Sequence, residues 1–108
     1  MLEISSAEEG QTLVVTLSGR VDAPASKQLE EQAQHWVEAG QHRLVLDCSA
    51  INYISSAGLR VFLLIAKKIA AAQGSLKLCG LNGAVREVFD ISGFSKLFTI
   101  VPTRADAL

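Results

Sequence analysis

The sequence predicts one α/β domain over residues 1–108: a mostly parallel, four- to five-stranded sheet with an N-terminal hairpin strand and helices packed against it. Three observations predict this class. A chain of 108 residues suits one compact domain and is too short for two. Short apolar runs alternate with segments whose apolar residues recur every three or four positions. The run at 44–46 is continuously apolar, which is typical of a parallel strand covered on both faces.

The first expected elements are two strands and a helix. Apolar residues alternate with others in segments 2–4 and 12–17, which predicts a hairpin. Asp22 followed by Pro24 is a helix-start pattern, because an acidic side chain can cap the first turn and proline fits inside it. Gly40 is expected to end this helix.

Strands and helices alternate from residue 44 onward. The expected segments are a strand at 44–46, a helix at 57–73, a strand at 76–79, a short helix around 85–89 and a strand at 98–101. The tail after residue 101 is expected to fray. Phe94 fits neither the helical nor the strand spacing of apolar residues. We expect its ring in the core, and the alternative is an exposed apolar patch that contacts a partner.

This element order places the expected binding site at one edge of the sheet. In parallel βαβ units each strand-to-helix loop leaves at the carboxyl ends of the strands, where ligands usually bind. That edge is predicted to collect Asp22, the polar loop at 52–58 and the loop at 80–83.

Composition excludes several classes of protein. Of the residues, 49% are hydrophobic, which excludes an intrinsically disordered chain. The formal charge of −1 gives no electrostatic reason to expect binding to nucleic acid or to an anionic membrane. The longest apolar run, 61–65, is far shorter than the ~20 residues of a membrane span. The N-terminus lacks a secretion signal, so we expect a cytoplasmic protein. Cys48 and Cys79 lie in apolar runs and are expected to be buried, reduced thiols.

The sequence contains few of the residue patterns that are typical of a catalytic site. His35 falls inside the first helix and His42 precedes the central strand, so neither can act as a base for a serine at the loop edge. No phosphate-binding loop, dinucleotide fingerprint, nucleophile elbow or metal-ligand spacing occurs. A small serine hydrolase that uses Ser56 would lack its histidine. We therefore expect no enzyme and no cofactor.

Ser55 and Ser56 stand directly before the expected second helix. One interpretation is helix capping, which contributes about 1 kcal/mol. The other is phosphorylation, since the free N–H groups and the dipole of a helix N-terminus tolerate a phosphate. Both roles can fall on one residue. We expect phosphorylation on Ser56, with a cost of about 0.5–2 kcal/mol for Ser56→Ala if its hydroxyl also caps the helix. Ser55→Ala is expected to be phosphorylated and to bind its partner nearly as the wild type does.

The stretch from 44 to 60, Leu-Val-Leu-Asp-x-Ser-x-Ile-x-Tyr-Ile-Ser-Ser-Ala-Gly-Leu-Arg, resembles the signature of the STAS domains, specifically of bacterial anti-anti-sigma factors (anti-sigma factor antagonists). Segment 17–22 is similar to the family's L-x-G-x-[LV]-D motif. Segment 81–94 is similar to its closing helix motif. The resemblance spans nearly the whole chain in the expected element order.

The resemblance implies a phosphoacceptor at Ser56 and a partner-contacting acidic residue at Asp22. The family's frequent aspartate before the acceptor is Ser55 here, and the serine or threonine after it is Ala57, so recognition by a kinase is expected to differ. The partner-binding residues implied by the resemblance and by the loop edge are Asp22, Asn52, Tyr53, Ser55, Ser56, Ala57 and Gly58.

The mechanism that the resemblance implies is partner switching. The unphosphorylated protein binds an anti-sigma factor, a serine kinase with the histidine-kinase-like ATPase fold, and frees the sigma factor. Phosphorylation of Ser56 breaks the complex, and a PP2C-type phosphatase restores the serine. Two alternatives within the family are a subunit that docks on a lipid-transport ABC ATPase and a stressosome-type scaffold.

Overall fold

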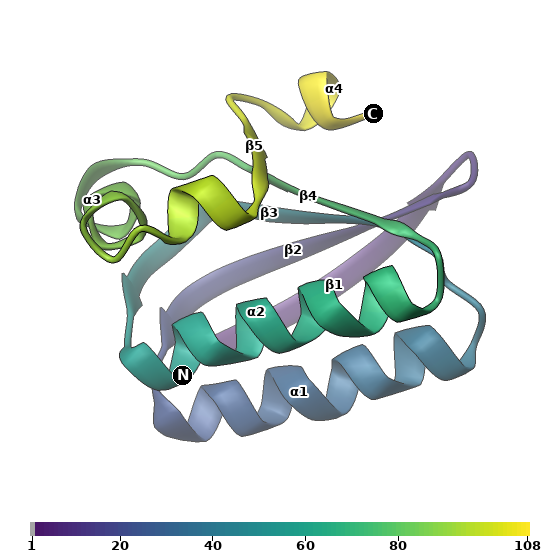
Figure 1. Ribbon diagram of the computed structural model, residues 1–108, viewed down its shortest axis with the longest axis horizontal. Helices are drawn as coiled ribbons and strands as arrows, with labels where there is room; N and C mark the ends of the chain where they lie inside the picture. Colours follow the sequence, from purple (N-terminus) through teal and green to yellow (C-terminus); the bar gives the residue numbers. More distant parts are fainter. Residues whose placement is uncertain (1) are drawn as a thin grey trace.

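A five-stranded sheet with the strand order β1-β2-β3-β4-β5 forms the centre of the protein (Figure 1). The structure is a computed structural model that describes residues 2–108. The strands are β1 (Leu2–Glu9), β2 (Thr12–Val21), β3 (Arg43–Ile54), β4 (Ser75–Cys79) and β5 (Thr99–Val101). The helices are α1 (Ala23–Glu38), α2 (Ser56–Ala71), α3 (Gly83–Ile91), the 3-10 helix η1 (Phe94–Leu97) and α4 (Arg104–Ala107).

The strand pairing confirms the predicted sheet. β1 and β2 form an antiparallel hairpin, and β2, β3, β4 and β5 run parallel to one another. The predicted start of the first helix is also confirmed, because Asp22 caps α1 and accepts a hydrogen bond from the N–H of Ala25 at 3.2 Å. Gly40 follows the end of α1 with a φ of 82°, a left-handed conformation that glycine adopts without strain.

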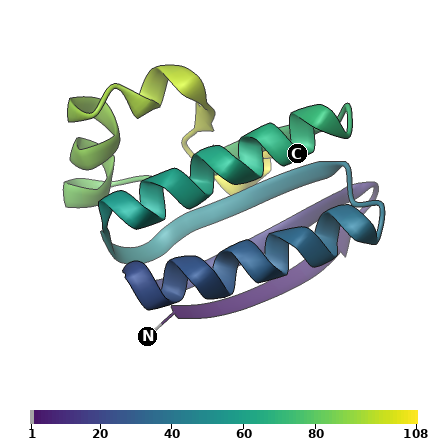
Figure 2. The same cartoon turned by 60° about the horizontal axis from the view of Figure 1, so that its bottom comes forward.

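The two faces of the sheet are covered very differently. Helices α1 and α2 lie side by side on one face (Figure 2), and α3 joins the same core through Val85 and Phe89. Apolar residues of α2 recur every three or four positions, so one stripe of the helix faces the sheet. On the other face, a small cluster forms where Ala107 of α4 packs on Val14, Val45 and Cys79.

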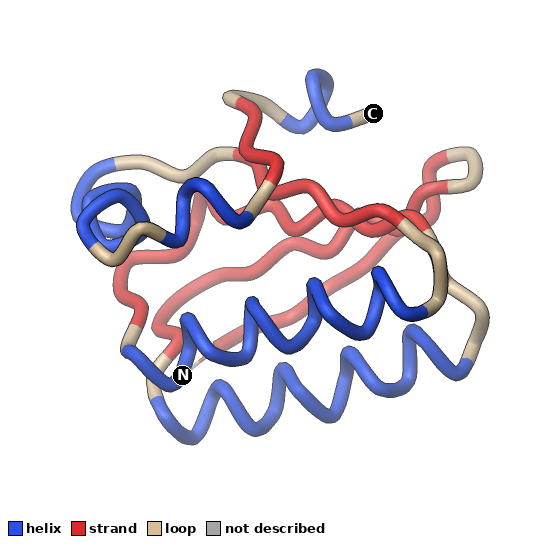
Figure 3. The backbone as a smooth tube through the Cα atoms, in the orientation of Figure 1, coloured by secondary structure: helices blue, strands red, loops and turns tan. Residues whose placement is uncertain are grey.

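β3 is much longer than the sequence predicted. The expected loop at 52–58 is strand up to Ile54, and only a short loop separates β3 from α2 (Figure 3). The reason is that β2 also continues to Val21 and keeps pairing with β3 through two register shifts, one of them between Gly19 and Arg20. Such bulges let polar strand residues stay paired while the strands bend. Asn52 and Tyr53 therefore project from a strand.

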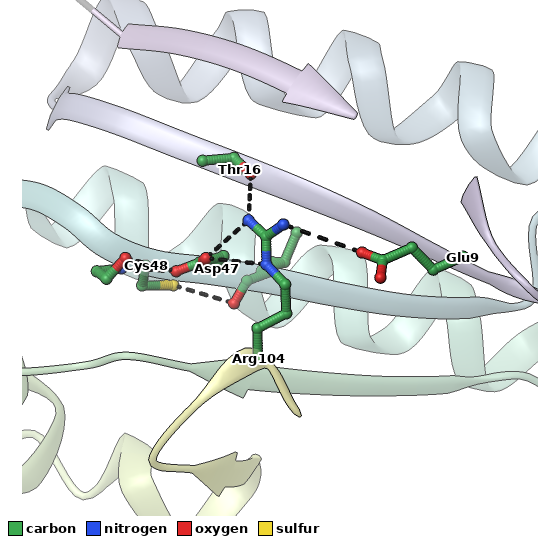
Figure 4. Close-up of polar contacts among 7 residues, drawn as sticks. Glu9, Thr16, Asp47, Cys48 and Arg104 are labelled. Carbon is green, nitrogen blue, oxygen red and sulfur yellow. Dashed lines mark hydrogen bonds and ion pairs between the residues drawn. The ribbon is translucent and has the colours of Figure 1, made fainter. Parts of the chain in front are cut away.

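The prediction of a frayed tail is wrong. Residues 104–107 form α4, and Thr103 caps it by accepting a hydrogen bond from the N–H of Asp106 at 3.2 Å. Ala107 is only 4% exposed. Arg104 binds the carboxylate of Asp47 at 2.9 Å (Figure 4). The tail is ordered because it covers apolar side chains of the sheet and supplies the counter-charge of a half-buried carboxylate.

Both cysteines are free and buried, as expected. Burial raises the pKa of the Cys79 thiol to about 11, and burial also raises the pKa of Cys48 strongly. Phe94 is neither fully buried in the core nor fully exposed as a patch for a partner. Its ring is half-buried and packs against the core, with its centre 6.4 Å from that of the Phe98 ring. His35 and His42 are exposed.

Candidate functional site

The carboxyl edge of the sheet brings two helix starts together. Val21 ends β2 and Ile54 ends β3, and these two residues are partners in the parallel ladder. Asp22 and Ser55 follow directly and cap α1 and α2. The N–H of Ser55 donates to the carbonyl of Val21 at 2.9 Å, which joins the two strand-to-helix connections. The edge that the topology predicted for a site therefore does collect these residues.

Ser55 is the cap of α2. Its hydroxyl accepts a hydrogen bond from the N–H of Gly58 at 3.1 Å and donates one to the carbonyl of Val21 at 3.1 Å. The expectation that Ser56 caps the helix is therefore wrong. The two serines differ by one position, and only Ser55 has the extended backbone that an N-cap requires. The expectation that Ser55→Ala leaves phosphorylation and partner binding nearly unchanged stays a prediction, although this change removes the helix cap.

Ser56 is the first residue of α2 and is exposed. No hydrogen bond from its hydroxyl is present within residues 2–108. The backbone N–H groups of Ser56 and Ala57 lie in the first turn, where an α-helix offers no internal acceptor. The hydroxyl thus stands in the open, beside unpaired donors and the positive end of the helix dipole.

Arg20 connects two of the predicted site residues, Asp22 and Tyr53. Its Nε lies 4.0 Å from the Asp22 carboxylate, and its guanidinium lies 4.2 Å from the centre of the Tyr53 ring. Arg20 and Tyr53 are partners in the β2–β3 ladder, so their side chains share a face. Sequence reasoning missed Arg20 because the strands were predicted to stop before it. Its position two residues before Asp22 was the available signal.

Gly58 has a packing role. It is buried, and a Cβ atom there would lie 2.7 Å from the carbonyl oxygen of Val21 and 2.9 Å from Cγ1 of Ile54. Only glycine lets the first turn of α2 approach the ends of both strands this closely. Of the predicted partner-binding residues, Gly58 is therefore buried inside the edge, whereas Asn52, Tyr53 and Ser56 are exposed.

A shallow groove runs between α1 and α2 beside Ser56. It encloses about 300 Å³ and is bordered by Ala57, Lys27, Glu30 and Arg60. Ala57 is half-buried and forms part of its floor. Sequence reasoning missed this groove because its charged residues have the pattern of an ordinary solvated helix face.

The exposed hydroxyl of Ser56 has no histidine beside it. His35 lies in the last turn of α1, and His42 precedes β3, so both stand at the far end from Ser56. No group of three metal-ligating side chains comes together in the part of the chain from 2 to 108. None of the helices described is long and apolar enough to cross a membrane.

Comparisons with known proteins agree with this architecture. The family model of the STAS domain matches residues 3–107. BtrV of Bordetella bronchiseptica, named as a candidate anti-sigma factor antagonist, is 46% identical over 95 residues, which cover 88% of this chain and 82% of BtrV. The anti-sigma F factor antagonist of Paenibacillus polymyxa is 29% identical over 99% of this chain and 92% of its own.

A solved structure supports the same assignment. The crystal structure of an anti-sigma factor antagonist from Mycobacterium paratuberculosis superposes with a TM-score of 0.89 at 25% identity, over 99% of this chain and 91% of that one. The match extends over β1 to α4, so it includes the sheet edge described above. The chain belongs to the STAS domain family.

Proposed function

We propose that this protein is an anti-sigma factor antagonist that works by partner switching. In its unphosphorylated form it binds an anti-sigma factor, and the sigma factor is released. Phosphorylation of Ser56 then breaks the complex. The names of the relatives described above support the first step, because each is an antagonist of an anti-sigma factor by name. Such a role places the protein in the cytoplasm.

The observation that carries the proposal is the placement of Ser56. Its hydroxyl is exposed at the first residue of α2, at the sheet edge where Asp22, Arg20 and Tyr53 also meet solvent. A kinase can reach such a hydroxyl without unfolding the helix, since the cap is formed by Ser55 instead. Phosphorylation therefore adds charge to the surface and leaves the helix start intact.

The proposed partners are those that the resemblance to anti-sigma factor antagonists implies. The anti-sigma factor is proposed to be a serine kinase of the histidine-kinase-like ATPase fold, which supplies the base, ATP and magnesium. A PP2C-type phosphatase is proposed to hydrolyse the phosphoserine. The phosphoryl group passes from ATP to the Ser56 oxygen, the hydroxyl proton goes to the kinase's base, and ADP leaves.

Electrostatics explains how one phosphate can end the complex. Phosphorylation adds a charge of about −1.5 to −2 at neutral pH. In an interface fitted to the uncharged hydroxyl, this charge loses water and stands near the carboxylate of Asp22. Removing a charge from water without a matched partner costs several kcal/mol, which is comparable to the binding energy of a micromolar complex.

The test uses an anti-sigma factor kinase that binds this protein, together with ATP. Phosphopeptide mapping should find the phosphate on Ser56, and Ser56→Ala should abolish labelling while partner binding persists. Ser5→Ala, a change at an exposed serine of β1, is the matched control and should label as the wild type does. Labelling on Ser55 would contradict the proposed acceptor. No labelling with active kinase would favour docking on an ATPase or a scaffold over partner switching.

A further inference from the structure

A second concave site lies on the sheet face opposite α1 and α2, at the other end of β3 from Ser56. It encloses about 410 Å³, within the range of small-molecule sites. Thr12 and Arg43 contribute from the first positions of β2 and β3, and Lys77 from the middle of β4. Gln73 contributes from the α2–β4 connection, and Ala107 borders one side. None of these residues belongs to the edge around Ser56.

The strand register sets the direction of the two charged side chains. Leu44 and Leu46 are buried under the helices, so the alternate residues Arg43 and Val45 face the opposite side. Lys77 is the ladder partner of Val45 and therefore shares that face. Strands ~4.8 Å apart with a rise of ~3.3 Å per residue put the Cα atoms of Arg43 and Lys77 about 8 Å apart. Two side chains this far apart can close on one small molecule.

The cavity is basic in an otherwise balanced protein. Its lining includes the side chains of His42, Arg43 and Lys77 and no acidic side chain, and the main-chain carboxylate of Leu108 is the one negative group that the lining residues carry. No ion pair of Arg43 or Lys77 is present between residues 2 and 108, although the chain has a formal charge of −1. Concave surfaces lined by one sign of charge concentrate counter-ions.

Arg104, at the start of α4, contacts side chains of β1, β2 and β3 (Figure 4). One of its terminal nitrogens lies 2.9 Å from Asp47 and 2.9 Å from Thr16 Oγ1, and the other lies 3.9 Å from Glu9. These contacts fix α4, and its last residue, Ala107, borders the cavity together with the following Leu108. They also occupy the guanidinium of Arg104, so the charges left for a ligand are those of Arg43 and Lys77.

We propose that this cavity binds a small molecule with at least two anionic groups, phosphate or carboxylate. Arg43 offers a planar fork of donors that matches either group, and Lys77 offers a point charge for the second. Thr12 and Gln73 add neutral polar contacts at the same rim. The site stands apart from the proposed function, because it lies at the opposite end of the sheet.

Titration with inorganic pyrophosphate and with citrate, at constant ionic strength, tests the proposal by calorimetry and by amide NMR shifts. At least one probe should bind with a Kd below about 1 mM, with shifts concentrated at 73–77 and 104–107. Pyrophosphate binding alone would assign the site to phosphates, and citrate binding alone would assign it to carboxylates. Arg43→Gln and Lys77→Gln should each weaken binding about tenfold.

Lys67→Gln is the matched control, because Lys67 is an exposed lysine of α2 outside the cavity. It should bind as the wild type does. Thermal unfolding shows whether each variant is folded, and Lys77→Met, which keeps the aliphatic stem, replaces Lys77→Gln if that variant is unfolded. Absence of binding by both probes overturns the proposal, and so does binding that Arg43→Gln and the Lys77 variant leave unchanged.

Discussion

Ser55 and Ser56 are neighbours in the chain with opposite surroundings. The hydroxyl of Ser55 is held between the Gly58 N–H and the Val21 carbonyl, each at 3.1 Å, whereas Ser56 is exposed. The cap of α2 is therefore formed by Ser55, and the proposed phosphorylation falls on Ser56, which takes no part in that cap. A change at the exposed serine can alter recognition without loosening the helix, and a change at the half-buried one loosens the helix.

This division predicts different costs for the two alanine variants. Ser55→Ala should lower the free energy of unfolding by about 0.5–2 kcal/mol, because it removes a helix cap and leaves the Gly58 N–H without its partner. Ser56→Ala should change it by less than about 0.5 kcal/mol, as an exposed position does. Urea denaturation of both variants at pH 7 measures the difference. Equal costs would contradict the assignment of the cap to Ser55.

At the scale of elements, the C-terminal segment depends on one carboxylate. Oδ1 of Asp47 accepts from the backbone and hydroxyl of Ser49, and Oδ2 accepts from Arg104. Burial alone would raise the pKa of Asp47, but the hydrogen bonds from Ser49 and Arg104 outweigh burial and lower it. Asp47 therefore joins β3 to α4 in its ionised form, and α4 in turn covers Val45 and Cys79.

The lowered pKa of Asp47 predicts a pH-dependent contribution to stability. Since the folded-state pKa lies below the unfolded value of about 3.9, the stabilisation is complete above that value and is lost as the pH falls through the folded pKa. Asp47→Asn should cost about 1–2 kcal/mol at pH 7. Its cost should shrink as the pH falls below the unfolded value of about 3.9 and through the lower folded-state pKa. Urea denaturation of both proteins across this range gives the answer. A cost that does not change with pH would exclude ionised Asp47 as the cause.

Arg104→Ala provides a second test of the same element, with Cys79 as the reporter. Cys79 is fully buried beneath α4, whereas Cys48 is buried under the helices on the other face. Loss of the Arg104–Asp47 ion pair should let α4 open locally. The rate at which a thiol reagent labels Cys79 should then rise about tenfold. The labelling rate of Cys48 should stay unchanged and is the internal control. Equal increases in the labelling rates of Cys48 and Cys79 would indicate global destabilisation instead.

For the whole molecule, local patterns in the sequence were sufficient for the element order, the hairpin and the α1 cap at Asp22. They were insufficient where long-range contacts decide. The extension of β3 to Ile54 depends on pairing with β2 across register shifts, and α4 depends on an ion pair between residues 47 and 104. The site edge was predictable because parallel topology alone places it. The role of Arg20 was not, since it comes from a cross-strand contact with Tyr53.

The last prediction separates folding from recognition in the whole protein. The first turn of α2 tolerates negative charge, since free N–H groups and the helix dipole favour it. The groove that Ala57 borders carries two positive side chains, Lys27 and Arg60, and one negative side chain, Glu30. Phosphorylation of Ser56 should therefore change the free energy of unfolding by less than about 1 kcal/mol. It should nevertheless weaken binding to the anti-sigma factor by about a hundredfold or more.

Ser56→Asp should fall between the two states in binding, because one carboxylate carries less charge and fewer acceptor oxygens than a phosphate. Calorimetric unfolding and binding titrations on the unmodified, phosphorylated and Ser56→Asp proteins give both quantities. A phosphorylated protein that is markedly less stable would mean that release follows local unfolding of α2. A stable one that has lost binding places the switch at the interface, where an added charge meets a surface fitted to a hydroxyl.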